Sequence, residues 1–382
     1  MVPDTQKVMI KAIALIDSFK GCLTSSQAGK AAIAAFQSGE AASIPVSDGG
    51  EGFSTIMTEM LGGSFKEISC SDPLGRPIKA RYGLLDNGET AIIETAEASG
   101  LGLLLQEERN PLQATSYGTG ELILDALKHG AKNIWLGLGG SATCDGGTGL
   151  LQALGYRFLC PEDEGDRQSL MLKDVRGIDA THKCNLLSHC KITGFYDVSV
   201  PFCGQEGAAM MFAPQKGATP AMAESLDKWM AKLCKEYSKY SGKEIMNIPG
   251  AGAAGGIGGA IGGVLGAEMA LGVQKVLDIA GLESLLNGCT LVITGEGKAD
   301  IQTLKGKVPM GVLEYVRAHT GPENRPKIVL IAGQVSDLQQ LLDAGFDAVL
   351  QITPAGMPLS EAMIPATAIA NITRTIKDYL LC

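Results

Sequence analysis

Short apolar runs alternate with helical patterns at both ends of the chain. Residues 8–16 and 42–46 predict buried strands, and each run is followed by a polar loop and then by a helical pattern. The same order returns near the C-terminus, where residues 291–294, 328–331 and 348–352 predict strands. Strand, loop and helix in repeated order are typical of a parallel sheet covered by helices.

The middle of the chain follows a different pattern. Residues 65–70, 78–85 and 90–94 predict successive antiparallel strands, and Asp86-Asn87-Gly88 is a hairpin-turn sequence. The other predicted elements are a helix capped by Thr24-Ser25-Ser26 and ending near Phe36, a helix capped by Thr115-Ser116 and ending at Lys128, a solvated loop at 161–168, a strand at 192–198 and an amphipathic helix at 221–240.

These patterns predict an α/β protein of two domains, as the length of 382 residues also favours. We expect residues 1–64 plus 286–382 to form a discontinuous, doubly wound Rossmann- or flavodoxin-like domain with a parallel sheet. Residues 65–285 would form a second α/β domain inserted into it. Two domains in continuous order are the alternative.

Net charge and cysteine usage indicate which partners and which cellular location to expect. The formal net charge is −9 and basic runs are absent, which argues against nucleic acid because phosphate-backbone binding needs clustered Lys and Arg. The ten cysteines show neither C-x-x-C pairs nor zinc-ligand spacing, and the N-terminal segment lacks a signal-peptide pattern. We therefore expect a cytoplasmic location, because such cysteine usage fits a reducing compartment.

One segment has the length of a membrane span. Residues 249–267 carry no charge, but they are mostly Gly and Ala, and Glu268 follows directly. Small residues let backbones approach closely, so we expect this segment to be buried between packed elements and the protein not to be a membrane protein.

A glycine-rich stretch in the middle of the chain is the strongest candidate for an anion site. The apolar run 134–136 leads into a loop that contains Gly137, Gly139, Gly140, Ser141 and Thr143. Consecutive glycines bring backbone N–H groups close to a ligand, and a following helix N-terminus favours an anion. The stretch predicts a phosphate site, with a plain strand-to-helix turn as the alternative.

Charged side chains follow three predicted strands of the parallel sheet. Ligands of such sheets bind beyond the carboxyl ends of the strands. The charged and polar residues at these ends are Asp17, Ser18 and Lys20 after the first strand, Asp48 and Glu51 after the second, and Glu296 and Asp300 after the strand at 291–294. Each one alone fits a helix cap or turn, whereas all three groups together favour a site.

Several reaction classes lack their motifs. Gly137-x-Gly139-x-x-Ala142 and Gly250-x-Gly252-x-x-Gly255 match the dinucleotide fingerprint, but neither has the full strand and acidic-residue context, so an NAD-dependent dehydrogenase is the weaker alternative. Walker A, protein-kinase and G-x-S-x-G motifs are absent, and Cys144 has no nearby His. Phosphoryl transfer needs phosphate donors, a cation, carboxylates for Mg²⁺ and a carboxylate near the attacking hydroxyl, and the chain supplies each of these.

A series of segments in fixed order carries a family resemblance. They are DSFKG (17–21), SDGGEG (47–52), DPLGRP (72–77), GTGELI (118–123), GLGGSATCDGGTG (137–149), PQKGA (214–218), PGAGAAGG (249–256), TGEGKAD (294–300) and GKVP (306–309). With these segments the chain resembles the bacterial type I glycerate kinases over nearly its whole length. The resemblance implies phosphorylation of D-glycerate by ATP with Mg²⁺, usually to 2-phosphoglycerate, and two α/β domains with the site in the cleft between them.

The candidate residues take the following roles. We hypothesise that Asp48 or Asp197 orients the glycerate hydroxyl and removes its proton, and that the other holds Mg²⁺ together with Glu296 and Asp300. The substrate and its phosphoryl group would be bound by Lys20, Asp17, Ser18 and Glu51, the substrate carboxylate by Arg76 or Lys307, and the nucleotide phosphates by Gly137, Gly139, Gly140, Ser141 and Thr143.

The chain departs from the family pattern at three places. Leu-Ile precedes Asp17 where the family commonly has Ala-Pro, Cys144 replaces an Asn, and Val200 stands where an Asn follows Asp197 in the family. The sequence leaves open whether the product is 2- or 3-phosphoglycerate and whether the chain forms a homodimer. A non-catalytic sugar-acid sensor on the same scaffold is a further alternative.

Overall fold

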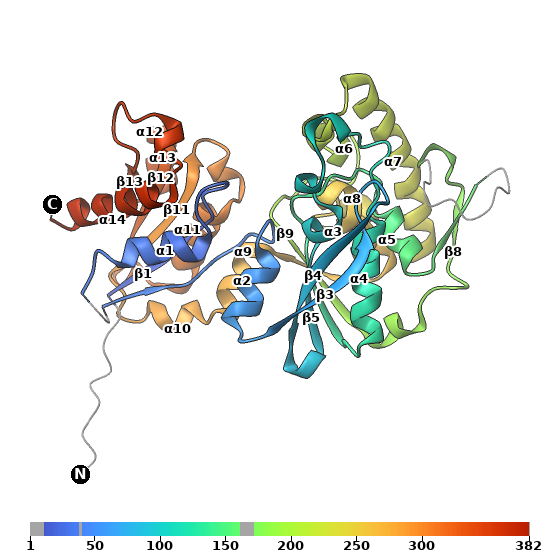
Figure 1. Ribbon diagram of the computed structural model, residues 1–382, viewed down its shortest axis with the longest axis horizontal. Coiled ribbons are helices and arrows are strands. Elements are labelled where there is room, and N and C mark those ends of the chain that lie inside the picture. Colours follow the sequence, from blue (N-terminus) through green and yellow to red (C-terminus); the bar gives the residue numbers. More distant parts are fainter. Residues whose placement is uncertain (1–10, 38–39, 161–171, 382) are drawn as a thin grey trace, which may run out of the picture. The chain divides into compact units, whose positions relative to one another are not determined.

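The computed structural model describes residues 11–37, 40–160 and 172–381 and divides into two compact units. The first unit contains the chain up to Asp48 and from Val273 onward, and the second unit contains Gly49–Gly272. In Figure 1 the first unit carries the colours of both chain ends, blue and orange to red. Each unit is described by itself.

The first unit is built on a parallel sheet. Its described strands are β1 (Ala12–Ile16), β2 (Ala41–Ser43), β11 (Leu291–Ala299), β12 (Lys327–Val335) and β13 (Ala348–Gln351). They lie in the order β13-β12-β11-β1-β2, and each described pair is parallel. Counted along the chain this is the 2-1-3-4-5 order of flavodoxin-like folds, in which the strand order reverses between the first and third strands. The reversal lies between β1 and β11.

Helices cover both faces of this sheet. The helices are α1 (Ser25–Ile33), α9 (Gly272–Ile279), α10 (Leu282–Leu286), α11 (Val308–His319), α12 (Leu338–Ala344), α13 (Leu359–Ala362) and α14 (Pro365–Leu381). Ala14 and Ile16 pack in one core with α1 and α14, whereas Ile13 and Leu15 pack in the other core with α9, α10 and α11. Alternate side chains of a strand point to opposite faces, so β1 is buried on both sides, as a doubly wound sheet requires. The predicted α/β fold class is confirmed.

The second unit contains a mixed sheet. Its described strands are β3 (Ser64–Ser71), β4 (Pro77–Leu85), β5 (Thr90–Glu94), β6 (Asn133–Gly137), β9 (Lys191–Tyr196) and β10 (Glu268–Leu271), and β7 (Arg157–Leu159) pairs with β8 (Gly177–Asp179) apart from it. The pairs β3–β4 and β4–β5 are antiparallel, as predicted, and the pairs from β5 through β6 and β9 to β10 are parallel. The parallel strands direct their carboxyl ends to one edge.

The helices of the second unit pack around a large core. They are α2 (Phe53–Met60), α3 (Thr95–Ser99), α4 (Tyr117–Lys128), α5 (Thr148–Ala153), α6 (Ala208–Phe212), α7 (Pro220–Ser241) and α8 (Ala253–Gly259), with a π-helical turn at Ala260–Val264. Residues 250–263 are buried, which confirms that the uncharged Gly/Ala segment packs inside the protein. Across the described parts of the chain, none of the helices combines the length and apolar character that a membrane crossing needs.

Some predicted boundaries differ from the structure. The units divide after Asp48 and Gly272, whereas the predicted domain boundaries followed residues 64 and 285, because α2 packs on β4 and β5 and Val273 joins the core of the first unit. The division into folding domains stays a prediction. Residues 8–10 and the predicted loop 161–168 lie outside the described residues.

One local prediction was wrong, and two predicted helix caps are in place. The strand predicted at 291–294 continues to Ala299, because β12 pairs with it up to Val335, so Glu296 lies within β11 and does not follow it. The predicted cap at Thr115-Ser116 is confirmed in place: Ser116 is the N-cap of α4 and the Thr115 hydroxyl accepts the N–H of Tyr117, while the Ser116 hydroxyl donates to Asp145. The predicted cap at Thr24 is confirmed, and its hydroxyl accepts the N–H of Gln27.

Candidate active site

Three carboxylates and a lysine of the first unit interact around the end of β1. Asp17 follows β1 directly, and its Oδ1 accepts the N–H of Ser18 at 2.7 Å. Burial raises the pKa of Asp17 to about 7, and the charges of Asp48 and Glu296 add to this rise. The bond from Ser18 and the charge of Lys20 act in the opposite direction. The structure therefore brings Asp17, Lys20, Asp48 and Glu296 together at the β1–β11 switch point, where ligands of such sheets bind.

Glu296 is held by two donors. Its side chain is buried, and it accepts the Thr303 hydroxyl at 2.6 Å and the Lys307 ammonium at 2.9 Å. Asp300 lies close by in the chain and pairs with Lys298 at 3.0 Å. Burial is the largest single influence and would raise the pKa of Asp300, but the bonds from Lys298 and Gln302 and the charges of Lys298 and Lys307 together lower it. Asp300 is therefore a charged carboxylate, and Lys307 already has an acidic partner.

The glycine-rich loop of the second unit follows β6 and is fixed at its backbone. The carbonyl of Gly140 accepts the N–H of Leu101 at 2.8 Å, and Ala142 donates to the carbonyl of Ser99 at 2.8 Å. Gly140 has a φ of 66°, which favours glycine. A Cβ on Gly139 would collide with the Cα of Gly50, so the backbones of the two loops are in close contact.

A buried lysine supports this loop from within the unit. Lys216 is 3% exposed, and its ammonium donates to the Ser141 hydroxyl at 2.9 Å and to the Thr143 carbonyl at 2.7 Å. Burial lowers the pKa of Lys216, whereas Cys144 and Asp145 act in the opposite direction. The Thr143 hydroxyl is buried and has no hydrogen-bond partner in the structure. The lysine thus orients the loop, and the Thr143 hydroxyl is left for another group.

Asp145 connects the glycine-rich loop to two helix N-termini. Its carboxylate accepts the N–H and the hydroxyl of Ser116, each at 2.8 Å, and the N–H groups of Gly147 at 3.0 Å and Gly149 at 3.2 Å. Burial raises the pKa of Asp145, and the bonds from Ser116, Gly147 and Gly149 counteract the rise. This carboxylate is saturated by donors and acts as a structural anchor.

Glu94 plays the same part for the loop at residues 49–52. It ends β5 and accepts the N–H of Gly52 at 3.0 Å and the N–H of Ser54 at 3.1 Å. Burial raises the pKa of Glu94 to about 7, although these bonds lower it. Glu94 therefore positions the start of α2 and, next to it, the exposed Glu51.

The remaining predicted residues of the second unit differ in their surroundings. Asp197 directly follows β9 and is half-buried. Arg76 donates to Asp72 and to Glu108, both at 2.6 Å, and these two hydrogen bonds, with Glu108 first, raise its pKa. Arg76 thus fastens a turn to a neighbouring segment.

Burial raises the pKa of the Cys144 thiol, which agrees with its predicted lack of nucleophilic character.

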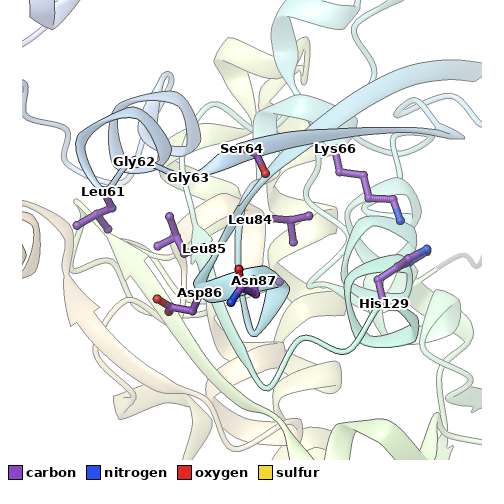
Figure 2. A pocket seen from close by; sticks show the side chains of 11 residues that line it. Leu61, Gly62, Gly63, Ser64, Lys66, Leu84, Leu85, Asp86, Asn87 and His129 are labelled. Atoms are coloured by element: carbon purple, nitrogen blue, oxygen red, sulfur yellow. The ribbon is translucent and has the colours of Figure 1, made fainter.

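The second unit also has a cavity away from the predicted site residues. Figure 2 shows that it is lined by Leu61, Leu84 and Leu85 together with the polar side chains of Lys66 and His129. Lys66 and His129 both contact Asp125, at 3.3 and 3.4 Å. The cavity contains none of the predicted site residues.

Comparison with known proteins places the chain in a family. The model of the glycerate kinase family matches residues 12–380. The chain belongs to this family of enzymes.

Its relatives match over almost their full length. The chain is 39% identical to the glycerate 2-kinase of Escherichia coli strain K12, over 97% of each protein, and 38% identical to a glycerate kinase of Halalkalibacterium halodurans, over 91% of this chain and 92% of the relative. A crystal structure from Salmonella typhimurium LT2, described as a candidate glycerate kinase 2, has a TM-score of 0.81 and 35% identity, over 97% of each chain. Family membership argues against the dehydrogenase alternative.

Three residues with clear parts in the site geometry were missing from the predicted site. Lys216 lies within the PQKGA segment that carries the family resemblance, Asp145 lies within the glycine-rich stretch, and Glu94 ends a predicted strand. A polar residue inside a family segment was the available signal for Lys216 and Asp145. Glu94 had no such signal, because its partners are more than 39 residues away in the sequence.

Proposed function

We propose that this protein transfers the γ-phosphoryl group of ATP to D-glycerate and releases 2-phosphoglycerate. The observation that carries the proposal is the gathering of Asp17, Lys20, Asp48 and Glu296 at the switch point of a parallel sheet, in a chain of the glycerate kinase family. The position of the new phosphate is supported by the relative from Escherichia coli that is named a glycerate 2-kinase.

The acceptor hydroxyl needs a carboxylate that orients it and takes its proton. Asp48 and Asp197 are the candidates. Asp48 lies in the loop after β2, Asp197 directly follows β9, and both are half-buried. A carboxylate is sufficient for this step, because phosphoryl transfer depends mainly on positioning and on stabilisation of charge. Asp17 and Ser18 would bind the remaining polar groups of the substrate, with Glu51 as a further candidate.

Negative charge on the transferred group needs cations. Lys20 is exposed and interacts with Asp17, so it is placed to neutralise the phosphoryl group in the transition state. Lys307 is the better candidate of the two for the glycerate carboxylate, because Arg76 already donates to Asp72 and Glu108. Lys307 has one acidic partner, Glu296, and retains further donors.

The nucleotide phosphates would lie on the glycine-rich loop. Gly137, Gly139 and Gly140 give the backbone its close approach, and Ser141 and the unpartnered hydroxyl of Thr143 supply further donors. Lys216 would keep the Ser141 hydroxyl and the backbone of Thr143 in place without contacting the phosphates itself.

Mg²⁺ would bind through carboxylates of the first unit. Mg²⁺ takes oxygen ligands and in kinases uses one or two carboxylates plus substrate phosphates. Glu296 and Asp300 offer such oxygens. Burial is the main cause of the raised pKa of Asp17, and a cation would relieve the part that the charges of Asp48 and Glu296 add. Within the described residues, no group of three or more His, Cys, Asp or Glu side chains could hold a metal ion. When bound, the ion supplies neutralisation of phosphate charge.

The test is ADP release from ATP and Mg²⁺ with one acceptor at a time. We expect release with D-glycerate and not with L-glycerate, glycerol or hydroxypyruvate. Phosphorus NMR of the product should show the 2-phosphate, and a 3-phosphate would overturn that part of the proposal. Nucleotide binding without release with any acceptor would instead favour a sensor. The cysteine usage supports a cytoplasmic location, which fractionation of cells would check.

A further inference from the structure

Among the described residues, two buried polar side-chain atoms have no hydrogen-bond partner. They are the hydroxyl oxygen of Thr143, in the glycine-rich loop, and Nε of Arg109. A buried donor without an acceptor costs free energy, so such a group in a folded protein indicates a partner that binds to it. The Thr143 hydroxyl belongs to the proposed phosphate site, and Arg109 lies in the same unit.

Arg109 packs against the segment that supports the glycine-rich loop. A Cβ on Gly217 would collide with the carbonyl oxygen of Arg109 and would lie 3.1 Å from its Cβ, so the Arg109 side chain begins beside Gly217. The residue before Gly217 is Lys216, whose ammonium donates to the Ser141 hydroxyl and to the Thr143 carbonyl. Consecutive residues therefore contact Arg109 and the loop that contains Thr143.

The chain on both sides of Arg109 is fixed against the same loop. Leu104 and Ala114 pack together with Ala142 of the glycine-rich loop in one small core. The N–H of Ala114 donates to the carbonyl of Asn110 at 3.0 Å, which closes the turn that follows Arg109. The backbone of Arg109 is thus held in place beside the loop before any ligand binds.

A phosphate site needs positive charge, and other cations of the second unit are already engaged. Lys216 is 3% exposed, and its ammonium is used within the glycine-rich loop. Arg76 and Arg81 each pair with a glutamate, at 2.6 and 3.9 Å. Arg109, in contrast, is half-buried and has a donor without a partner. An arginine side chain presents a planar fork of donors that matches the oxygens of a phosphate.

We propose that Arg109 is a binding residue for the nucleotide phosphates and donates from its guanidinium to oxygens of the polyphosphate held by the glycine-rich loop. This inference rests on the proposed function and adds one residue to its site. The Thr143 hydroxyl and Arg109 Nε then find their acceptors in the same ligand. Because the contact is made with bound nucleotide, its loss affects the affinity for ATP more than the rate of transfer.

Titration calorimetry with ATP, and separately with inorganic tripolyphosphate, tests the proposal. Arg109→Met keeps the apolar stem and removes the donors, so it should weaken the binding of both ligands by about 10–100-fold. Arg109→Lys, which keeps the charge and loses the fork, should lie between Arg109→Met and wild type. The KM for ATP should rise in parallel, and the KM for D-glycerate should not.

Arg81→Met is the matched control. It removes an exposed arginine of the same unit, so its affinity for both ligands should stay within about twofold of wild type. An Arg109→Met protein that binds ATP as tightly as wild type would overturn the proposal. An equal loss of affinity in Arg81→Met and Arg109→Met would overturn it as well, because the loss would then reflect only the net charge.

The outcomes distinguish this inference from the proposed function. If wild type releases ADP with D-glycerate and Arg109→Met binds ATP unchanged, the role of Arg109 alone is wrong. If wild type binds tripolyphosphate without releasing ADP, and Arg109→Met weakens that binding, the phosphate site is supported and the proposed reaction is wrong. Wild type that binds neither ATP nor tripolyphosphate would overturn both.

A measurement on wild type decides the case in which the variants do not fold. Phenylglyoxal modifies guanidinium groups, and peptide mapping by mass spectrometry identifies the modified arginines. Saturating ATP should slow the modification of Arg109 and leave that of Arg81 unchanged, whereas D-glycerate alone should protect neither. Modification of Arg109 at the same rate with and without ATP would overturn the proposal.

Discussion

The two units use buried carboxylates in opposite ways. In the second unit, Asp145 accepts four hydrogen bonds and Glu94 accepts three, from backbone N–H groups and hydroxyls. In the first unit, Asp17 has one backbone donor and faces the charges of Asp48 and Glu296. A buried charge is tolerated only when its partners satisfy it. The arrangement of Asp145 and Glu94 is therefore structural, whereas Asp17 would be satisfied by a bound cation or substrate.

This contrast separates residues whose loss should affect folding from residues whose loss should affect turnover. Saturated carboxylates hold the loops of the second unit in shape. Asp17 of the first unit reduces stability when it is charged and is retained for chemistry, as strained groups at functional sites often are. The variants below test the two halves of this comparison.

The largest effect is expected for Lys20→Met. The variant removes the cation beside Asp17 that would stabilise the transferred phosphoryl group, so kcat should fall by about 10²–10³-fold. The free energy of unfolding should change little, because Lys20 is exposed. ADP release and urea unfolding measure the two quantities. A loss of stability equal to the loss of turnover would assign Lys20 to the structural group.

Asp145→Ala should mainly destabilise the fold. It leaves the donors of Ser116, Gly147 and Gly149 without an acceptor, so the free energy of unfolding should fall by about 3–5 kcal/mol. Urea unfolding followed by circular dichroism measures this change. Glu107→Gln, an exposed position of the same unit, is the control and should stay within about 0.5 kcal/mol of wild type. An equally stable Asp145→Ala protein would contradict the anchoring role.

Asp17→Asn should stabilise the protein at high pH. The pKa of Asp17 is raised to about 7 in the folded state, so its favourable contribution is present below pH 4 and is lost as the pH rises through 7. The amide avoids that loss, so the variant should equal wild type near pH 4 and exceed it by about 2–4 kcal/mol near pH 8.

The measurement is urea unfolding of Asp17→Asn and wild type across this pH range. Glu323→Gln, which replaces an exposed acid of the same unit, is the control. A constant difference between Asp17→Asn and wild type at all pH values would show that Asp17 is not crowded by its neighbours.

The smallest effect separates the two candidates for the glycerate carboxylate. Lys307→Gln should raise the KM for D-glycerate by about tenfold, since one exposed charged contact is lost. Arg76→Gln should leave that KM nearly unchanged, because Arg76 is engaged by Asp72 and Glu108. Steady-state kinetics at saturating ATP measures both. The reverse order of the two KM values would reassign the carboxylate to Arg76.

The sequence predicted the parts that depend on local pattern. Ala12–Ile16 and the run at 328–331 lie on strands that are buried on both faces, and such strands are continuously apolar. Because parallel strand ends meet at one edge, Asp17 and Asp48 could be grouped before the structure was known. Glu296 was placed after its strand, since Gly295 and Gly297 are residues that normally interrupt strands.

The parts that the sequence did not predict depend on contacts between distant segments. Lys216 meets Ser141 across 75 positions, and Asp145 meets Ser116 across 29. A buried lysine or aspartate looks like a surface residue until its partners are known, because charged side chains are almost never fully buried unless paired.

The comparison of Asp48→Asn and Asp197→Asn tests the central claim most directly. Both proteins and wild type are assayed for ADP release with D-glycerate, and their unfolding is measured alongside. We predict that wild type turns over, that at least one variant loses about 10³-fold or more in kcat as expected for a missing general base, and that both unfold like wild type. Near wild-type turnover in both folded variants would contradict the assignment of these carboxylates to the acceptor hydroxyl.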